Sequence, residues 1–138
     1  MKIFFNKKRL IKEIQNTKDL GFVPTMGSIH KGHLSLIKKS KKLSSKTIVS
    51  IFVNKPQFNN KNDFKKYPRS IKKDINLLKK IKINYLYLPS AKEIYPHGRN
   101  KKIKISKWKK ILCGKNRKGH FEAVVDVVDR FIKIIKPD

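Results

Sequence analysis

Apolar residues recur along the chain in two kinds of spacing, one helical and one typical of strands. Where they stand three or four positions apart among lysines, the pattern predicts helices with one buried face. Short runs rich in valine, isoleucine and threonine predict buried strands instead. The predicted helices cover residues 6–17, 31–43, 70–81 and 119–136, with a short helix opened by a capping box at Ser90, and the predicted strands cover residues 20–24, 47–53 and 83–88.

Two further segments have weaker patterns. Residues 55–68 carry prolines and asparagines, which predicts a loop. Residues 101–105 alternate basic and apolar positions, which predicts an edge or hairpin strand.

The helical spacing also predicts which side chains face the core. The last helix carries so many apolar residues that it is expected to be buried on more than one side. The predicted inward positions are Leu10, Ile11 and Ile14; Leu34, Ile37 and Leu43; Ile71, Ile75, Leu78 and Ile81; and, in the last helix, Phe121, Val124, Val125, Val128, Ile132 and Ile135, widened by Val127, Phe131 and Ile134.

Strands that alternate with helices predict an α/β fold, with a Rossmann-like parallel sheet flanked by helices. Ligands of such sheets bind beyond the carboxyl ends of the strands. The turn at His30–His33 and the loop at Asn54–Phe58 each follow a predicted strand. We therefore expect both segments at the same edge of the sheet.

The charge of the chain is extreme, with 36 Lys and Arg against 9 Asp and Glu among 138 residues and a formal net charge of +27. Such a chain is expected to bind polyanions nonspecifically at low salt. The lysines are spread over every segment, and aromatic residues do not interleave with them in an RNA-binding pattern. Most of the lysines are therefore interpreted as a solvated surface rather than a dedicated nucleic-acid face.

Cysteine content and hydropathy indicate a cytoplasmic protein. The single cysteine, Cys113, excludes an internal disulfide and fits a reducing compartment. No window resembles a membrane-spanning stretch, and the apolar run after Met1 is too short for a secretory signal.

The segment Pro24-Thr25-Met26-Gly27 runs directly into His30-Lys31-Gly32-His33, where a strand gives way to a helix. The first turn of a helix has unpaired backbone N–H groups and a positive dipole end, so this place suits polyphosphate. Either imidazole could donate a hydrogen bond to phosphate or a proton to a leaving group. By itself, the His-x-Gly-His tetrapeptide is equally compatible with a surface pair or half of a metal site. The histidines lack a matching carboxylate or thiolate set, so no protein metal site is predicted.

Further blocks follow the histidines in a fixed order. They are Asn54, Pro56, Gln57 and Phe58; Tyr67-Pro68-Arg69; Leu112-Cys113-Gly114; Arg117; and Gly119-His120-Phe121. This ordered set resembles the pantoate–β-alanine ligase (pantothenate synthetase) family of the His-x-Gly-His nucleotidyltransferase superfamily. The resemblance covers nearly the whole chain.

The resemblance implies a reaction in two steps. ATP and pantoate form pantoyl adenylate and pyrophosphate, and the amine of β-alanine then attacks the adenylate to give pantothenate and AMP. Mg²⁺ would accompany ATP, and a homodimer is expected. The resemblance gives His33 the proton-donor role with His30 as its partner on the phosphates, and it places around ATP the residues Met26, Gly27, Ser28, Ile29, His30, Lys31, Gly32 and His33.

The later blocks supply the remaining predicted roles. Gln57 matches a glutamine that contacts pantoate and β-alanine, and Asn54 either holds the loop or reaches the substrate. Arg117 is expected to steer anions into the site. A histidine in the position of His120 is more often a helix-start or core residue than a catalyst.

The chain departs from the family pattern at several positions. The order Asn54-Lys55-Pro56-Gln57 puts proline one place later than usual, which leaves the direction of the Gln57 side chain open. Asp126 stands where threonine is common, and a carboxylate in so apolar a helix needs a partner.

The end of the chain is the largest departure. The sequence stops at Asp138, where family members continue into further strands and a small C-terminal domain. Residues 1–138 are therefore predicted to form an incomplete Rossmann-like nucleotide-binding domain, truncated before the last strands and without the C-terminal lid domain. A fragment, a degraded gene product and half of an enzyme completed by another chain are all compatible with this. Alone, the chain is expected to be a poor catalyst. The alternative functions are a nucleotidyltransferase with another acceptor and a basic nucleic-acid-binding relic.

Overall fold

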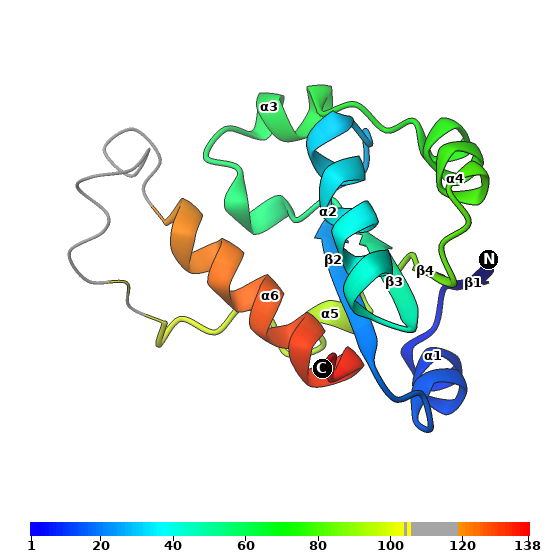
Figure 1. Ribbon diagram of the computed structural model, residues 1–138. Coiled ribbons are helices and arrows are strands. Elements are labelled where there is room, and N and C mark those ends of the chain that lie inside the picture. The colour runs from blue at the N-terminus through cyan, green and yellow to red at the C-terminus, as the bar shows by residue number, and fades with distance from the viewer. Residues whose placement is uncertain (104, 106–118) are drawn as a thin grey trace.

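A computed structural model describes residues 1–103, 105 and 119–138. Strands and helices alternate along the chain (Figure 1). The strands are β1 (Lys2–Phe4), β2 (Leu20–Thr25), β3 (Lys46–Ile51) and β4 (Tyr85–Tyr87), and the helices are α1 (Lys7–Ile14), α2 (Lys31–Leu43), the 3-10 turn η1 (Lys55–Gln57), α3 (Lys61–Lys66), α4 (Ile71–Lys80), α5 (Ala91–Ile94) and α6 (His120–Ile135).

The four strands pair in parallel in the order β1-β4-β3-β2. Val49 of β3 stands opposite Val23 on one side and Leu86 on the other, so β3 is a central strand. Successive residues of β3 point to opposite faces, and residues 47–51 are all buried. The predicted α/β fold with a parallel sheet is confirmed.

Helices cover both faces of the sheet (Figure 1). On one face, α1, α5 and α6 pack against the side chains of Ile48 and Phe52. On the other, α2 and α4 pack against Val49 and Ile51 through Ile37 and Leu78. The two layers leave the carboxyl ends of β2 and β3 open to the segments that follow them.

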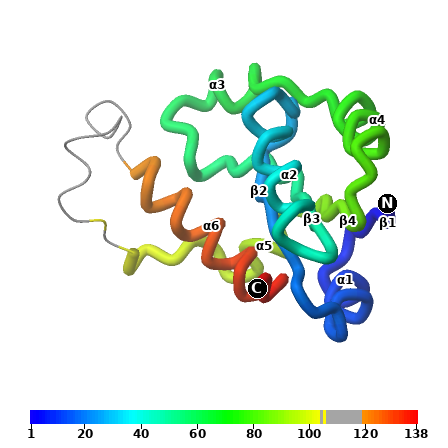
Figure 2. The backbone as a smooth tube through the Cα atoms, in the orientation of Figure 1, coloured from blue at the N-terminus to red at the C-terminus, as the bar shows by residue number. Residues whose placement is uncertain are grey.

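The chain end lies beside the start of β2 (Figure 2). Asp138 donates its backbone N–H to the carbonyl of Leu20 at 3.2 Å, and its carboxylate accepts from the backbone N–H of Leu20 at 2.7 Å.

Several elements differ from the sequence prediction. Strand β1 was not predicted, because three residues are too few to show a period. The loop prediction for residues 55–68 was wrong in part, since η1 and α3 form there and Asn60 caps α3 by accepting from the backbone N–H of Asn62. Residues 101–103 and 105 form no strand.

Some predicted core positions were also wrong. Ile11, Leu43, Ile71, Val125 and Ile132 are exposed by 39%, 69%, 47%, 45% and 48%. In α6, the buried face is the row Ala123, Val127, Phe131 and Ile135 together with Asp126. Because α6 is apolar nearly all round, its period could not decide which row meets the sheet.

In the described part of the chain, no helix has the length and apolar character needed to cross a bilayer.

Candidate functional site

Thr25, the last residue of β2, anchors the turn between β2 and α2. The hydroxyl of Thr25 donates to the carbonyl of Ser50 at 2.8 Å and accepts from the backbone N–H of Gly27 at 3.1 Å. Gly27 has φ of +82°, and a Cβ there would lie 3.1 Å from both Asp74 and Ile51. Only glycine fits this conformation without strain. The close approach at Gly27 is therefore to the protein's own helix α4 and strand β3.

Asp74 holds the next part of the turn, and sequence reasoning missed it. Its side chain is buried, with a residue exposure of 4%, and its two carboxylate oxygens accept from the backbone N–H groups of Ser28 at 2.8 Å and Ile29 at 2.9 Å. The one available signal was an acidic residue in the first turn of a helix, which is also common on exposed faces. Because Asp74 occupies these two N–H groups, they are not available to bind an anion.

The two histidines are arranged by the start of α2. His30 is the N-cap residue, and its Nδ1 accepts from the backbone N–H of Gly32 at 3.1 Å. The Nδ1 of His33 accepts from the backbone N–H of His30 across a longer 3.5 Å. Because an accepting Nδ1 carries a lone pair, the proton of each neutral ring is on Nε2. Both rings therefore present an Nε2–H donor to their surroundings.

The imidazole rings stack with centroids 4.0 Å apart and an interplanar angle of 30°. A Cβ on Gly32 would lie 3.0 Å from the His30 ring, so glycine lets that ring fold over the helix start. Burial, and secondarily the neighbouring His30, lower the pKa of His33 below its ordinary value. His33 is thereby kept neutral, in the form that donates from Nε2.

Asn54 and Gln57 lie across the cleft from the histidine turn. Asn54 is 1% exposed, and its Nδ2 donates to the carbonyl of Ala123 at 3.2 Å and to Oε1 of Gln57 at 3.0 Å. Pro56 occupies the first turn of η1, where a missing N–H is not needed by the helix. The displaced proline is therefore accommodated, and the Gln57 side chain is held from its oxygen end.

His120 supports the same loop from the start of α6. Its Nδ1 lies 2.8 Å from the backbone carbonyl of Gln57, and since a carbonyl only accepts, His120 donates from Nδ1. The tautomer of His120 is thus opposite to that of His30 and His33. Its position at a helix start agrees with the sequence expectation.

A cleft of about 400 Å³ brings the two sides together. The predicted site residues that line it are Met26, His30, His33, Asn54 and Gln57. Its remaining wall is formed by Pro24, Thr25, Phe52, Tyr67, Val124, Val127, Val128 and Phe131. The expectation that the histidine turn and the Asn54–Phe58 loop meet at one edge of the sheet is confirmed.

A second cavity, of about 500 Å³, shares Met26, Gln57 and Tyr67 with the first and extends to His120. Burial, with a smaller contribution from Asp74, raises the pKa of Tyr67, so its phenol stays protonated in the ordinary pH range.

Gly27 lines a third, more apolar cavity of about 390 Å³ beside Asp74. Neither Ser28 nor Ile29 lines any of these three cavities, and the predicted anion-steering Arg117 lies outside the described residues.

Among the described residues, no group of three or more His, Cys, Asp or Glu side chains could hold a metal ion. Arg69 donates to the carbonyls of Phe64, Lys65 and Tyr67 at the end of α3.

Fold and site together define a Rossmann-like α/β domain in which a His-x-Gly-His turn faces an amide pair across a cleft. A family model described as pantoate-beta-alanine ligase matches residues 2–138. The chain belongs to the pantoate–β-alanine ligase family, whose members are ligases that form a carbon–nitrogen bond.

Individual relatives agree with this assignment. The chain is 44% identical over 132 residues to a pantothenate synthetase of Caldicellulosiruptor saccharolyticus, covering 95% of the chain and 47% of the relative. It is 48% identical over 125 residues to one of Francisella philomiragia, covering 88% of the chain and 48% of the relative. The chain thus spans about half the length of the curated relatives it matches.

Solved structures give the same result for the fold. A pantoate-beta-alanine ligase of Francisella tularensis, complexed with beta-gamma ATP and beta-alanine, matches with a TM-score of 0.94 and 42% identity, over 99% of this chain and 54% of that one. A pantothenate synthetase of Thermus thermophilus matches with a TM-score of 0.90 and 33% identity, over 99% of this chain and 50% of that one.

Proposed function

We propose that this chain carries the N-terminal half of an ATP-dependent ligase that joins pantoate to β-alanine. Pantoate and ATP would give pantoyl adenylate and pyrophosphate, and β-alanine would then displace AMP to give pantothenate. The observation that carries the proposal is the cleft lined at once by His30, His33, Asn54 and Gln57. Its other support is the identity of 40–48% to pantothenate synthetases along most of the chain.

The histidine turn would act on the phosphates. The pantoate carboxylate is already ionised, so the first step needs alignment and charge stabilisation at phosphorus rather than a strong base. Two Nε2–H groups on stacked rings at a helix start are donors suited to phosphate oxygens. Mg²⁺ would enter with ATP, as the counter-ion of its phosphates.

The amide side would hold pantoate. With Oε1 of Gln57 engaged by Asn54, the Gln57 amide nitrogen is the end that can donate to a carboxylate or hydroxyl oxygen. The side chains of Val124, Val128 and Phe131 on the cleft wall suit the branched aliphatic body of pantoate.

The test is pantoate-dependent exchange of pyrophosphate into ATP. We would measure it with the purified chain alone and with the chain mixed with a full-length homologue inactivated at its own histidines. Exchange that appears in either sample and requires pantoate supports the proposal. Exchange that proceeds equally with other acids would favour a nucleotidyltransferase with another acceptor, and no exchange in either sample would contradict the proposed role.

Nucleic-acid binding is a second candidate function, favoured by the net charge of +27. It predicts binding to RNA or DNA that weakens steeply with salt and is indifferent to saturating pantoate and ATP.

Homodimerisation and a cytoplasmic location stay predictions; size determination in solution and fractionation of cells would test them.

A further inference from the structure

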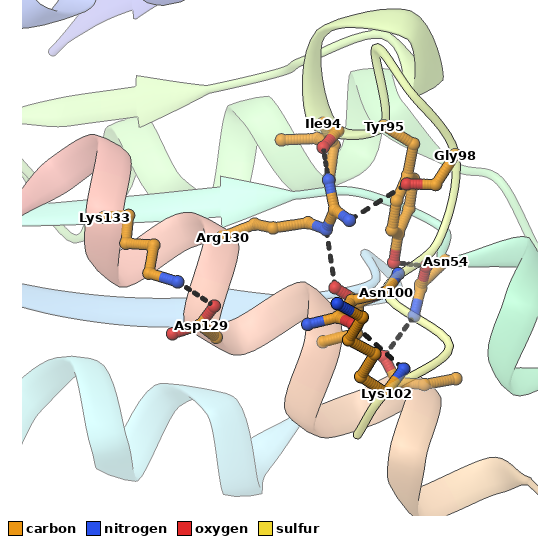
Figure 3. A network of polar contacts seen from close by, with 11 residues as sticks. Asn54, Ile94, Tyr95, Gly98, Asn100, Lys102, Asp129, Arg130 and Lys133 are labelled. Atoms are coloured by element: carbon orange, nitrogen blue, oxygen red, sulfur yellow. Dashed lines mark hydrogen bonds and ion pairs between the residues drawn. The ribbon is translucent and has the colours of Figure 1, made fainter.

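An ion pair on α6 between the partly exposed Arg130 and the buried Asp126 organises the segment that follows α5 (Figure 3). Nε of Arg130 donates to Oδ1 of Asp126 at 2.6 Å. The other guanidinium nitrogens donate to the carbonyls of Ile94 at 2.8 Å and Gly98 at 2.9 Å. Oδ2 of Asp126 accepts from the backbone N–H of Asn100 at 3.0 Å. The pair therefore ties residues 94–100 to α6 through three hydrogen bonds.

Tyr95 lies inside this clamped segment. The Arg130 guanidinium sits over the Tyr95 ring at 4.5 Å from its centroid, a favourable cation–π geometry. The Tyr95 hydroxyl lies 2.8 Å from Oδ1 of Asn54. Burial, and then Asp126, raise the pKa of Tyr95 to about 12, so the phenol keeps its proton and donates a hydrogen bond to Oδ1 of Asn54.

The donor and acceptor roles of Tyr95, Asn54 and Gln57 follow from the contact between Asn54 and the carbonyl of Ala123. The carbonyl of Ala123 can only accept, so the Asn54 atom that faces it is the amide nitrogen. That same nitrogen also faces Gln57, so the Gln57 atom in contact with it is the oxygen. The Tyr95 hydroxyl satisfies the opposite end of the Asn54 amide. With both ends of Asn54 engaged, the amide of Gln57, which lines the cleft, has one orientation, and its nitrogen is the end that Asn54 does not hold.

We propose that Tyr95, clamped by Arg130 and Asp126, is a positioning residue that acts through Asn54 to hold the Gln57 amide with its nitrogen toward the cleft. The cleft then selects, at that point, a ligand oxygen that accepts a hydrogen bond and disfavours an ammonium group. The part of this inference that concerns ligand affinity rests on the proposed function; the ordering of the Gln57 amide does not.

The test uses Tyr95→Phe, which removes the hydroxyl and keeps the ring under Arg130. The readout is ¹⁵N relaxation of the Gln57 side-chain amide in the full chain, assigned by its loss in Gln57→Glu. We expect an ordered amide in the unmodified chain and a mobile one in Tyr95→Phe. Calorimetry should show pantoate binding weakened about tenfold, as expected for one lost hydrogen bond in a buried set. Tyr85→Phe is the matched control, because Tyr85 is buried at the opposite end of the sheet.

Arg130→Lys separates positioning from simple packing. Lysine keeps the charge opposite Asp126 but cannot donate to Ile94 and Gly98 as well, so Tyr95 should be held less firmly. We expect a Gln57 amide of intermediate mobility in this variant. A Gln57 amide equally ordered in the unmodified chain, Tyr95→Phe and Arg130→Lys would overturn the inference. If the amide loosens as expected but pantoate-dependent exchange appears neither with the chain alone nor with its mixture with the inactivated homologue, the positioning role stands and the proposed function fails.

Discussion

The two sides of the cleft are held in different ways. On the histidine side, the rings of His30 and His33 take their orientation from backbone groups two and three residues away. On the amide side, Asn54 is bonded to Tyr95 and Ala123, which are 41 and 69 residues away, and His120 reaches the Gln57 carbonyl across 63 residues. The ring orientations on the histidine side are therefore set locally, although the turn before them is supported by Asp74 from 45 and 46 residues away, whereas the amide side exists only once the chain has folded.

The difference shows why one half of a site can be recognised from a few residues and the other cannot. A helix start fixes its own N-cap geometry wherever it occurs, so His-x-Gly-His carries its arrangement with it. An asparagine and a glutamine three residues apart carry no such information. Their orientation depends on Tyr95 and α6 being in place, which no local pattern indicates.

The largest expected effect is a loss of exchange rate when a histidine of the cleft is removed. His33→Ala removes the neutral Nε2–H donor, and a positioned group of this kind contributes about 100-fold or more to rate. Pantoate-dependent pyrophosphate exchange should fall by at least that factor under conditions where the unmodified chain supports it. His97→Ala is the control, since His97 is exposed and lines none of the cavities at this edge. Full exchange in His33→Ala would remove this residue from the mechanism.

The next largest effect is expected on stability, from the loss of Asp74, which supports the turn before the histidines. Asp74→Ala leaves the backbone N–H groups of Ser28 and Ile29 without their buried acceptor. The free energy of unfolding should fall by about 3 kcal/mol, because bonds to a charged group are strong and the donors are left unpaired. Urea denaturation measures this directly.

Asp129→Ala is the matched control for Asp74→Ala, since it makes the same change in net charge. Asp129 pairs with Lys133 at 2.7 Å, but the two side chains are 44% and 73% exposed. Its removal should cost under about 0.5 kcal/mol. Equal losses in the two variants would mean that Asp74 does not support the turn.

A smaller effect is expected from the amide side. Asn54→Ala leaves the carbonyl of Ala123 and the hydroxyl of Tyr95 without their partner in a buried place. The free energy of unfolding should fall by about 2 kcal/mol. Asn62→Ala, at an exposed position of the neighbouring helix α3, is the comparison. If Asn54→Ala is as stable as the unmodified chain, the buried amide is not part of what holds η1 against α6.

The sequence predicted the layers of the fold well and the packing of individual faces poorly. The β-branched run at 47–53 and the strand–turn–helix at Leu20–His33 gave β3, β2 and α2 nearly to the residue. In α4, by contrast, the first position chosen as inward was Ile71, which is 47% exposed, while Asp74 is buried. Periodicity assigns apolar residues to the core, and it cannot foresee a carboxylate that is buried to bind a neighbouring turn.

The candidate site follows the same division. The meeting of the His30–His33 turn and the Asn54–Phe58 loop could be predicted, because the carboxyl ends of neighbouring parallel strands share one edge. Asp126 could be recognised only as a carboxylate that needed a partner. That this partner is Arg130, one turn further on, and that the pair clamps residues 94–100, depends on where the sheet places α6.

The smallest expected effect is a pH dependence confined to the histidine side. Burial and the neighbouring His30 lower the pKa of His33 in the folded chain, so the unfolded chain binds a proton more readily. His33 therefore leaves the free energy of unfolding unchanged above its unfolded pKa of about 6.5. Its contribution lowers the free energy of unfolding as the pH drops below that value, and the loss levels off below the folded pKa. Urea denaturation between about pH 7.5 and 5 should show this loss. Its size should shrink in His33→Gln, which lacks the titrating group, and partly in His30→Gln, which removes one cause of the shift. An NMR titration midpoint for His33 at or above about 6.5 would contradict the lowered pKa and, with it, the expected loss of stability.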